Sequence, residues 1–395
     1  MKFEAKERDT YRLCMTIGVM LVISRVIMWL VYLLWSHMSG DQGSFAHAFF
    51  RWDAGWYKSI IESGYSDFNG IKLEGQNGAA NWAFFPLMPA YMVFLRKVLP
   101  SMGLEILGFL ANTAIFGIAL FAGSRYILLT RPQNGGKAAF FWLFIMCFGP
   151  YSFYYSSLYT ESIYLLCLCL CFYFLEQEQY IKLGFCGIFL SASRNTGVLF
   201  VFAILTHSLH RFFKDRMGEL NPKLLWEYVK KTLNDHKLIL GTCMCPLGLF
   251  LYMLHLYFLV GDPMAFAHVQ RAWGRKITNP VEVVLRTLDT ASKGTIKQEA
   301  YFLLCIIIGV CFLGWLLVQK HYAEFIMGCI FLVVPLSTGI ASIPRYMVGG
   351  FVFYLALADG LSGQKRYFKG CLLAVLGVIE LWLTYGWFSA WGFLT

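Results

Sequence analysis

The chain has 395 residues, a formal net charge of +10 and only 14% Asp, Glu, Lys and Arg, against about 25% in an average soluble domain. The hydrophobic residues (AVILMFWYC) make up 58% of the sequence. This composition argues against a soluble enzyme, a disordered chain and a nucleic-acid binder, because the charge is too sparse to solvate a globule of this size and the Lys and Arg residues are scattered between apolar runs.

Apolar stretches recur along the whole chain, and a helical membrane crossing needs about 20 such residues. The candidate stretches are 13–35, 84–99, 103–129, 138–157, 160–175, 181–206, 238–260, 301–318, 322–343, 347–361 and 370–393. We therefore predict an all-α, multi-pass membrane protein. The first stretch is too long for a cleaved signal peptide. The 12 cysteines form no CxxC pair and are expected to be small buried hydrophobic residues.

Polar interruptions occur in two of these stretches, at Ser193-Arg194-Asn195 and around Asn112. If each interruption divides its stretch into two half-helices that turn back inside the protein, the basic segments 2–12, 96–97, 125–137, 207–237 and 365–369 fall on one side. The positive-inside rule then makes that side, with the N-terminus, cytoplasmic. The same arrangement places five polar clusters together on the outer side: Arg51–Asp53, Tyr159–Ser162, Arg194-Asn195, Gln270–Arg275 and Pro344–Tyr346. We expect these clusters to form one extracytoplasmic site.

The domain organisation predicted from these segments is a single membrane domain over 1–395. Its largest connections are a first outer loop with an interfacial helix at 36–83, a basic cytoplasmic loop at 207–237 and a second outer loop at 261–299. None of them is long enough to form an independent domain.

The first outer loop contains the segment 49–65, which predicts a short helix that ends at Gly64. Phe49, Trp52, Trp56 and Ile60 would form its apolar stripe, with the tryptophans at the depth of the lipid headgroups. Asp53 lies beside that stripe. It is either a helix-capping or solvated carboxylate, or a general base acting on a lipid-linked substrate.

Charged residues also stand at the ends and in the middle of later stretches. Glu161 would lie in a first helical turn, where it either complements the helix dipole or orients a sugar hydroxyl or an arginine. Arg194 and Asn195 interrupt an apolar run, and because a central charge costs about 2.5–3.5 kcal/mol on insertion scales, they should face a cavity or a partner. For Arg25, also within an apolar run, we expect a structural partner.

Arginines and aromatic residues alternate in the second outer loop, from Gln270 through Trp273 to Arg275. The planar guanidinium suits bidentate binding of phosphate, although an interfacial helix with snorkelling side chains would have the same composition. Arg345 and Tyr346, after Pro344, indicate either a second phosphate contact or a helix-end anchor.

Taken in order, these motifs resemble the glycosylphosphatidylinositol mannosyltransferase II (PIG-V-like) family, in its compact prokaryotic form. The resemblance covers about residues 45–350. It rests on Arg51–Ala54 with Gly64-Tyr65, Phe84–Leu87, Tyr159–Ser162, Ser193–Asn195, Gly261–Pro263 with Phe266, Gln270 and Trp273-Gly274, and Pro344–Tyr346. The order Ser193-Arg194-Asn195 departs from the Arg-Ser-Asn-like order of the family.

The resemblance implies a glycosyltransferase of the GT-C superfamily, with about 11–13 transmembrane or half-spanning helices. Such an enzyme in the cell (inner) membrane would move a hexose, typically mannose, from a polyprenyl-phosphate donor to a glycan, lipid or protein hydroxyl, with inversion and Asp53 as the catalytic base. Residues expected to bind the donor phosphate or sugar are Arg51, Glu161, Arg194, Asn195, Gln270, Trp273, Arg275, Arg345 and Tyr346. Neither a metal nor another cofactor is expected. The alternatives are a secondary transporter or lipid flippase, and a membrane scaffold.

Overall fold

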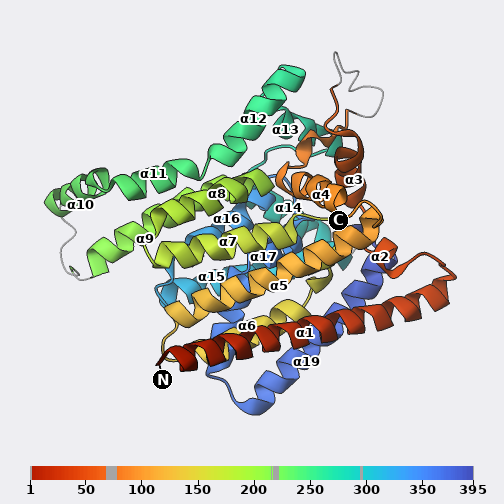
Figure 1. Ribbon diagram of the computed structural model, residues 1–395, viewed down its shortest axis with the longest axis horizontal. Coiled ribbons are helices and arrows are strands. Elements are labelled where there is room, and N and C mark those ends of the chain that lie inside the picture. The colour runs from red at the N-terminus through yellow and green to blue at the C-terminus, as the bar shows by residue number, and fades with distance from the viewer. Residues whose placement is uncertain (1, 68–77, 215, 217–221, 294–296, 395) are drawn as a thin grey trace. The chain divides into compact units, whose positions relative to one another are not determined.

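The computed structural model describes residues 2–67, 78–214, 216, 222–293 and 297–394. Within these residues every regular element is a helix (Figure 1), so the predicted all-α fold class is confirmed. Parts of the three predicted loops lie outside the described residues: 68–77 in the first, 215 and 217–221 in the second, and 294–296 in the third.

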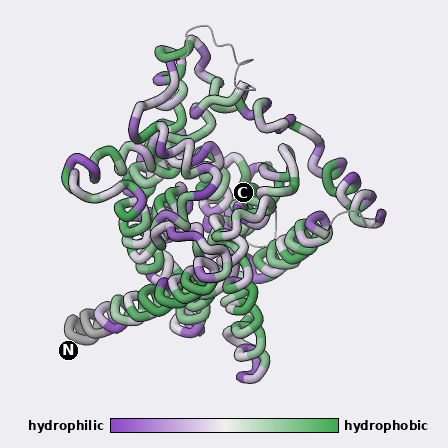
Figure 2. Tube along the Cα trace, turned by 90° about the vertical axis from the view of Figure 1, so that its right-hand side faces the viewer, coloured by the Kyte–Doolittle hydropathy of each residue, from purple (hydrophilic) through white to green (hydrophobic). Residues whose placement is uncertain are grey.

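Six helical segments of the described chain are long and apolar enough to cross a membrane: Asp9–Ser39, Leu104–Thr130, Asn195–Lys214, His236–Val260, Gln298–Val318 and Arg366–Phe388. Four shorter apolar helices accompany them: Gly135–Phe148, Tyr180–Ser193, Tyr322–Leu336 and Val352–Ser362. Apolar residues run along most of the first long helix (Figure 2), and its Val19, Val22 and Val26 are exposed, as residues that face lipid would be. The chain is an all-α multi-pass membrane protein.

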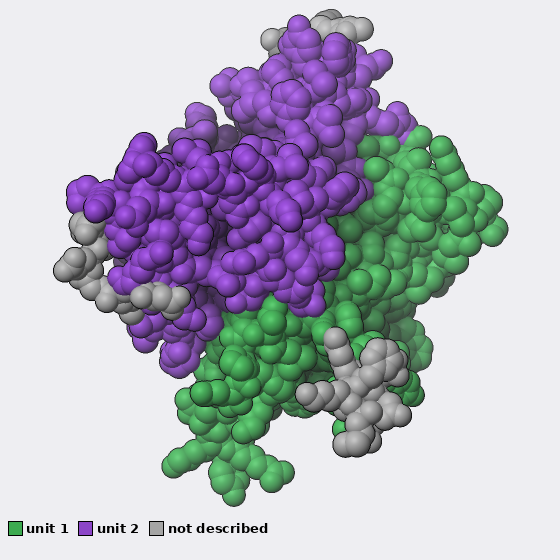
Figure 3. Space-filling view, turned by 60° about the vertical axis from the view of Figure 1, so that its left-hand side comes forward, with its two compact units in different colours: residues 1–62, 88–169, 354–395 green, residues 63–87, 170–353 purple. Residues whose placement is uncertain are grey.

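Two compact units make up the chain (Figure 3). Unit 1 comprises residues 1–62, 88–169 and 354–395, and unit 2 comprises residues 63–87 and 170–353. The expectation of one membrane domain stays a prediction. All 12 cysteines are free, as expected, but the expected burial is wrong for four of them, Cys14, Cys243, Cys311 and Cys371, which are exposed.

Unit 1 is built around the long helices at the two ends of the chain. Its elements are α1 (Lys2–Ser39), α2 (Phe45–Ala48), α3 (Ala54–Ser63), α4 (Leu87–Val98), α5 (Leu104–Thr130), α6 (Gly135–Phe148), η3 (Ser152–Ser156), the first half of α7 (Glu161–Glu176), most of α18 (Val352–Ser362), α19 (Arg366–Phe388) and η6 (Gly392–Leu394). Helix α1 packs against α5, α6 and α19. Helices α5 and α6 approach closely at Gly123, where a Cβ atom would lie 2.3 Å from the Trp142 ring.

The predicted partner of Arg25 is a set of hydroxyl groups inside unit 1. The Arg25 guanidinium is 8% exposed and donates hydrogen bonds to Ser156 Oγ (2.9 Å), Ser24 Oγ (3.1 Å) and Ser152 Oγ (3.2 Å). It also lies 5.1 Å from the centre of the Phe116 ring. These contacts account for a cation within a membrane-spanning helix, and confirm the structural interpretation.

Unit 2 holds the other helices of the described chain. They are η2 (Asn81–Ala83), the second half of α7, α8 (Tyr180–Ser193), η4 (Asn195–Leu199), α9 (Phe200–Lys214), α10 (Pro222–Asn234), α11 (His236–Met244), α12 (Leu247–Val260), α13 (Ala265–His268), η5 (Val269–Trp273), α14 (Pro280–Ser292), α15 (Lys297–Val318), α16 (Tyr322–Leu336) and α17 (Ile343–Gly349). Helix α8 packs against α11 and α12. Glycine permits this approach, since a Cβ at Gly248 would lie 2.0 Å from the Ile188 carbonyl oxygen.

The two predicted helix breaks have opposite outcomes. The break at Ser193–Asn195 is confirmed, because α8 ends at Ser193 and η4 begins at Asn195. The break at Asn112 is wrong, because α5 is continuous from Leu104 to Thr130. Asn112 is fully buried, and its side chain accepts a hydrogen bond from Tyr91 Oη and donates one to the Ser157 carbonyl. An amide satisfied in this way leaves the helix intact.

Four further breaks were not predicted. The stretch 138–157 leaves its α-helix after Phe148, before η3, and the stretch 322–343 leaves its α-helix after Leu336, before α17. The stretch 238–260 divides into α11 and α12 before Pro246, since proline cannot donate the helical hydrogen bond. The stretch 347–361 divides at Phe351, whose φ is 28°. The stretch 84–99 forms only the 12 residues of α4, about 18 Å at 1.5 Å per residue, which is too short to cross a bilayer.

Candidate active site

Asp53 lies in a backbone turn between α2 and α3, here called the Asp53 turn (residues 49–54). The Phe50 N–H donates to the His47 carbonyl at 2.8 Å, and the Ala54 N–H donates to the Arg51 carbonyl at 3.0 Å. The Asp53 carbonyl then accepts from the Trp56 and Tyr57 N–H groups, both at 3.1 Å. Asp53 is therefore the residue from which α3 starts, and its side chain is partly exposed.

The predicted helix over 49–65 is wrong in its first half. Helix α3 begins only at Ala54, because Trp52 has a left-handed backbone (φ 50°), which is unfavourable in a helix. Trp52 is 41% exposed outside the helix, and Trp56 is only partly buried. The buried face of α3 is formed by Ala54, Tyr57, Ile60 and Ile61, so Ile60 is the member of the predicted stripe that lies on it. The predicted end at Gly64, whose φ is 79°, is confirmed.

Arg51 connects the Asp53 turn to the end of α19. Its Nη2 donates to the Phe388 carbonyl at 3.0 Å, and its guanidinium lies 5.6 Å from the centre of the Trp35 ring. Burial lowers the pKa of Arg51 from its ordinary value, and the Asp41 carboxylate opposes that shift. Arginine remains charged at neutral pH even so. The cation therefore helps to hold the turn in place.

The segment that precedes α7 is buried next to the Asp53 turn. Tyr159 and Glu161 are 0% exposed, and Glu161 is the first residue of α7, as predicted. The Tyr159 hydroxyl donates to the Arg51 carbonyl at 3.1 Å and accepts from the Asp53 N–H at 3.2 Å. Two of the five predicted polar clusters, Arg51–Asp53 and Tyr159–Ser162, are thus in direct contact within unit 1.

In unit 2, the interruption after α8 places a cation beside α17. Arg194 has an extended backbone (φ −157°, ψ 147°), and its guanidinium lies 5.6 Å from the centre of the Tyr346 ring. The chain then folds back so closely that a Cβ at Gly197 would lie 2.4 Å from the Leu190 carbonyl oxygen. Asn195, the first residue after this break, is exposed.

The second outer loop also reaches the start of α17. Arg275 follows Gly274, whose left-handed backbone (φ 68°) ends η5. Its guanidinium donates to Gln270 Oε1 at 3.2 Å and to Ser342 Oγ at 3.5 Å. Ser342 is two residues from Pro344 and three from Arg345, which is partly buried. Within unit 2, the Arg194-Asn195 cluster therefore contacts Tyr346 of the Pro344–Tyr346 cluster, and the Gln270–Arg275 cluster contacts Ser342, two residues before Pro344.

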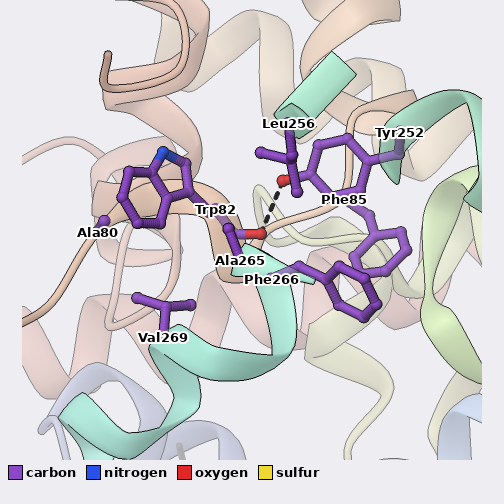
Figure 4. Packing of buried hydrophobic residues seen from close by; sticks show 8 residues of the cluster. All are labelled: Ala80, Trp82, Phe85, Tyr252, Leu256, Ala265, Phe266 and Val269. Atoms are coloured by element: carbon purple, nitrogen blue, oxygen red, sulfur yellow. Dashed lines mark hydrogen bonds between the residues drawn. The ribbon is translucent and has the colours of Figure 1, made fainter. Parts of the chain in front are cut away.

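A buried aromatic cluster supports this loop. It consists of Ala80, Trp82, Phe85, Tyr252, Leu256, Ala265, Phe266 and Val269 (Figure 4). The Tyr252 hydroxyl donates to the Trp82 carbonyl at 2.7 Å (Figure 4), and the Phe84 ring meets the Trp273 ring edge-on at 6.1 Å between centroids. The Phe84–Leu87 motif is thus a packing element beneath the second outer loop, and Trp273 is 38% exposed above it.

Several of these positioning contacts were missed from the sequence. Tyr159 was part of a predicted cluster, but its contact with the Asp53 turn was not predicted. The Phe388 carbonyl and Ser342 carry no sequence signal for their contacts with Arg51 and Arg275. Within the part of the chain that the structure describes, no group of three or more His, Cys, Asp and Glu side chains is arranged to hold a metal ion.

No family model and no curated protein matches this chain. Its fold is similar to solved structures of the oligosaccharyltransferase of Archaeoglobus fulgidus. For the form tethered to an acceptor peptide, the TM-score is 0.48 at 11% identity, over 95% of this chain and 55% of that chain. For the complex with an inhibitory peptide and a dolichol-phosphate, it is 0.42 at 11% identity, over 93% and 55%. The chain spans about half the length of these structures.

Proposed function

We propose that the protein is a glycosyltransferase that moves a hexose from a polyprenyl-phosphate donor to an acceptor hydroxyl, with Asp53 as general base. The observation that carries the proposal is the Asp53 turn. It holds a partly exposed carboxylate on a backbone that hydrogen bonds of Arg51 and Tyr159 hold in place. General-base catalysis needs such a fixed carboxylate and contributes roughly 10²–10⁴-fold.

In the proposed reaction Asp53 removes the proton of the acceptor hydroxyl, whose oxygen attacks the anomeric carbon. The bond from that carbon to the phosphate oxygen breaks, and the lipid phosphate leaves as an anion. The configuration at the anomeric carbon is thereby inverted. A stable anionic leaving group needs cations rather than an acid. Arg194, Arg275 and Arg345 would stabilise its developing charge, and Glu161 would hold an arginine or a sugar hydroxyl. Contacts to sugar or phosphate would come from Asn195, Gln270, Trp273 and Tyr346.

The proposed topology puts this chemistry on the outer face of the cell membrane. Because α4 has only 12 residues, we propose that it stays on the outer side while the continuous α5 crosses. This topology replaces the predicted helix break at Asn112, which was wrong. Of the basic residues predicted to be cytoplasmic, it moves only Arg96 and Lys97 to the outer side. The N-terminus stays cytoplasmic, and Trp52 and Trp56 would lie at the depth of the lipid headgroups.

The proposed donor sugar is mannose, the sugar implied by the resemblance to the mannosyltransferase II family. One of the solved oligosaccharyltransferase structures is tethered to an acceptor peptide, and another contains an inhibitory peptide and a dolichol-phosphate. For this chain we propose a glycan, lipid or protein hydroxyl as acceptor. Membership in the GT-C superfamily and in the mannosyltransferase II family belongs to the same proposal.

The test is to incubate the purified chain in nanodiscs with radiolabelled polyprenyl-phosphate mannose, or the glucose analogue, and a mixture of glycan and lipid acceptors. Release of free lipid phosphate with label on an acceptor supports the proposal, and a preference for mannose over glucose supports the proposed sugar. In liposomes, movement of the labelled lipid to the other leaflet with its glycosidic bond intact would contradict transfer and identify a flippase.

A further inference from the structure

We propose that Tyr159 is a positioning residue that sets the direction of the Asp53 carboxylate. This inference rests on the proposed function, because it assigns Tyr159 to the geometry of the proposed base. Tyr159 touches the backbone on both sides of Trp52 and needs no contact with substrate to act.

The Tyr159 hydroxyl joins the two ends of a three-residue segment. It donates its proton to the Arg51 carbonyl at 3.1 Å and accepts the Asp53 N–H at 3.2 Å. Between them lies Trp52, with φ at 50°, a backbone region that a bulky residue avoids unless the surroundings hold it there. The hydroxyl is therefore one of the groups that keep the segment in this conformation.

The position of that hydroxyl is fixed by the core of unit 1. Tyr159 is 0% exposed, its ring stacks on Tyr154 at 5.7 Å between centroids, and it meets the Trp387 ring edge-on at 5.6 Å. Because Glu161 starts α7 two residues later, the Tyr159 backbone is anchored as well. Because these contacts fix the Tyr159 side chain in the core of unit 1, its hydroxyl holds the Asp53 turn in one position relative to that core.

Loss of the hydroxyl removes the bridge without removing the ring. In Tyr159→Phe, the Arg51 carbonyl and the Asp53 N–H both lose this partner, and Trp52 can relax to a negative φ. Asp53 is next in the chain, so its carboxylate turns with the backbone. A general base displaced by a fraction of an ångström loses rate while the donor still binds, so kcat should fall by 10-fold or more and KM for the donor should stay within about twofold.

Tyr154→Phe is the matched control. Tyr154 is also buried, at 1% exposure, and its hydroxyl also donates to a backbone carbonyl, that of Leu394 at 2.8 Å. The substitution removes one buried hydroxyl from the same aromatic stack but leaves the Asp53 turn untouched. Its kcat should stay within about twofold of wild type, so a drop confined to Tyr159→Phe separates positioning from a general loss of packing.

The experiment measures kcat and KM for both variants, alone and combined with Asp53→Asn, together with amide hydrogen exchange of the peptide that contains residues 49–57, in nanodiscs. We expect faster exchange at Asp53 in Tyr159→Phe alone, and no further loss of rate when Tyr159→Phe is added to Asp53→Asn. Equal losses in both tyrosine variants, additive losses with Asp53→Asn, or wild-type kcat in Tyr159→Phe would each overturn the proposal.

Failure of the proposed function would look different. If the wild-type chain transfers no sugar, the reaction assigned to Asp53 is wrong and Tyr159 positions no base. Hydrogen exchange then decides whether the bridge itself exists, since unchanged exchange at Asp53 in Tyr159→Phe would overturn that part too.

Discussion

Tyr159 and Glu161 in unit 1 are enclosed, whereas some of the predicted site residues of unit 2 are exposed. Tyr159 and Glu161 are fully buried, and the Arg51 guanidinium donates to a backbone carbonyl. In unit 2, by contrast, Asn195 and Arg275 are exposed, and the Arg275 guanidinium donates to side-chain oxygens. The difference suits the two proposed tasks, because a base must be held in one direction while cations that follow a leaving phosphate can adapt.

The largest effect on stability should come from the buried arginine of unit 1. Arg25→Met removes hydrogen bonds to three serine hydroxyls and should lower the free energy of unfolding by about 1–3 kcal/mol. The exposed Arg275, replaced by Gln, should change it by less than about 0.5 kcal/mol. Thermal unfolding of the purified variants in detergent measures both changes in stability. Equal losses in the two variants would contradict the expected difference between the buried and the exposed arginine.

The next effect concerns activity rather than stability. Arg275→Gln removes a cation tied to Gln270 and Ser342, and should lower sugar transfer about tenfold, equivalent to about 1.4 kcal/mol, by weakening stabilisation of the leaving phosphate. The control is Arg286→Gln, on α14, where an exposed arginine pairs with Glu282 in its own helix. Transfer assays with saturating donor should separate them; identical rates would remove Arg275 from the mechanism.

The smallest effect tests the left-handed backbone of the Asp53 turn. Trp52→Gly places glycine where φ is 50°, and should leave stability unchanged or raise it by up to about 1 kcal/mol, because glycine adopts positive φ without strain. Trp56→Gly, two residues into α3, should lower it by about 1 kcal/mol or more through helix propensity alone. Thermal unfolding compares the two, and a large loss in Trp52→Gly would mean that its side chain, not its backbone, holds the turn.

How far the sequence could predict this structure depends on the kind of signal. Apolar runs and the Arg194 interruption have strong local signals, and both the membrane helices and the break after α8 were predicted from them. The break at Asn112 was wrong because a single buried amide can be satisfied by distant partners, Tyr91 and Ser157, that the sequence does not reveal. The same holds for Tyr159, whose hydroxyl contacts the backbone of Asp53 and Arg51. These residues come 106 and 108 positions earlier in the chain, so the contact exists only once the chain has folded.

The measurement that tests the central claim most directly is the single-turnover rate of sugar transfer by Asp53→Asn in nanodiscs, with polyprenyl-phosphate mannose as donor. The matched control is Asp67→Asn, an exposed carboxylate later in the same loop. We predict that Asp53→Asn keeps the wild-type unfolding temperature but loses roughly 10²–10⁴-fold in rate, while Asp67→Asn transfers at the wild-type rate. An Asp53→Asn rate within about twofold of wild type would contradict the account.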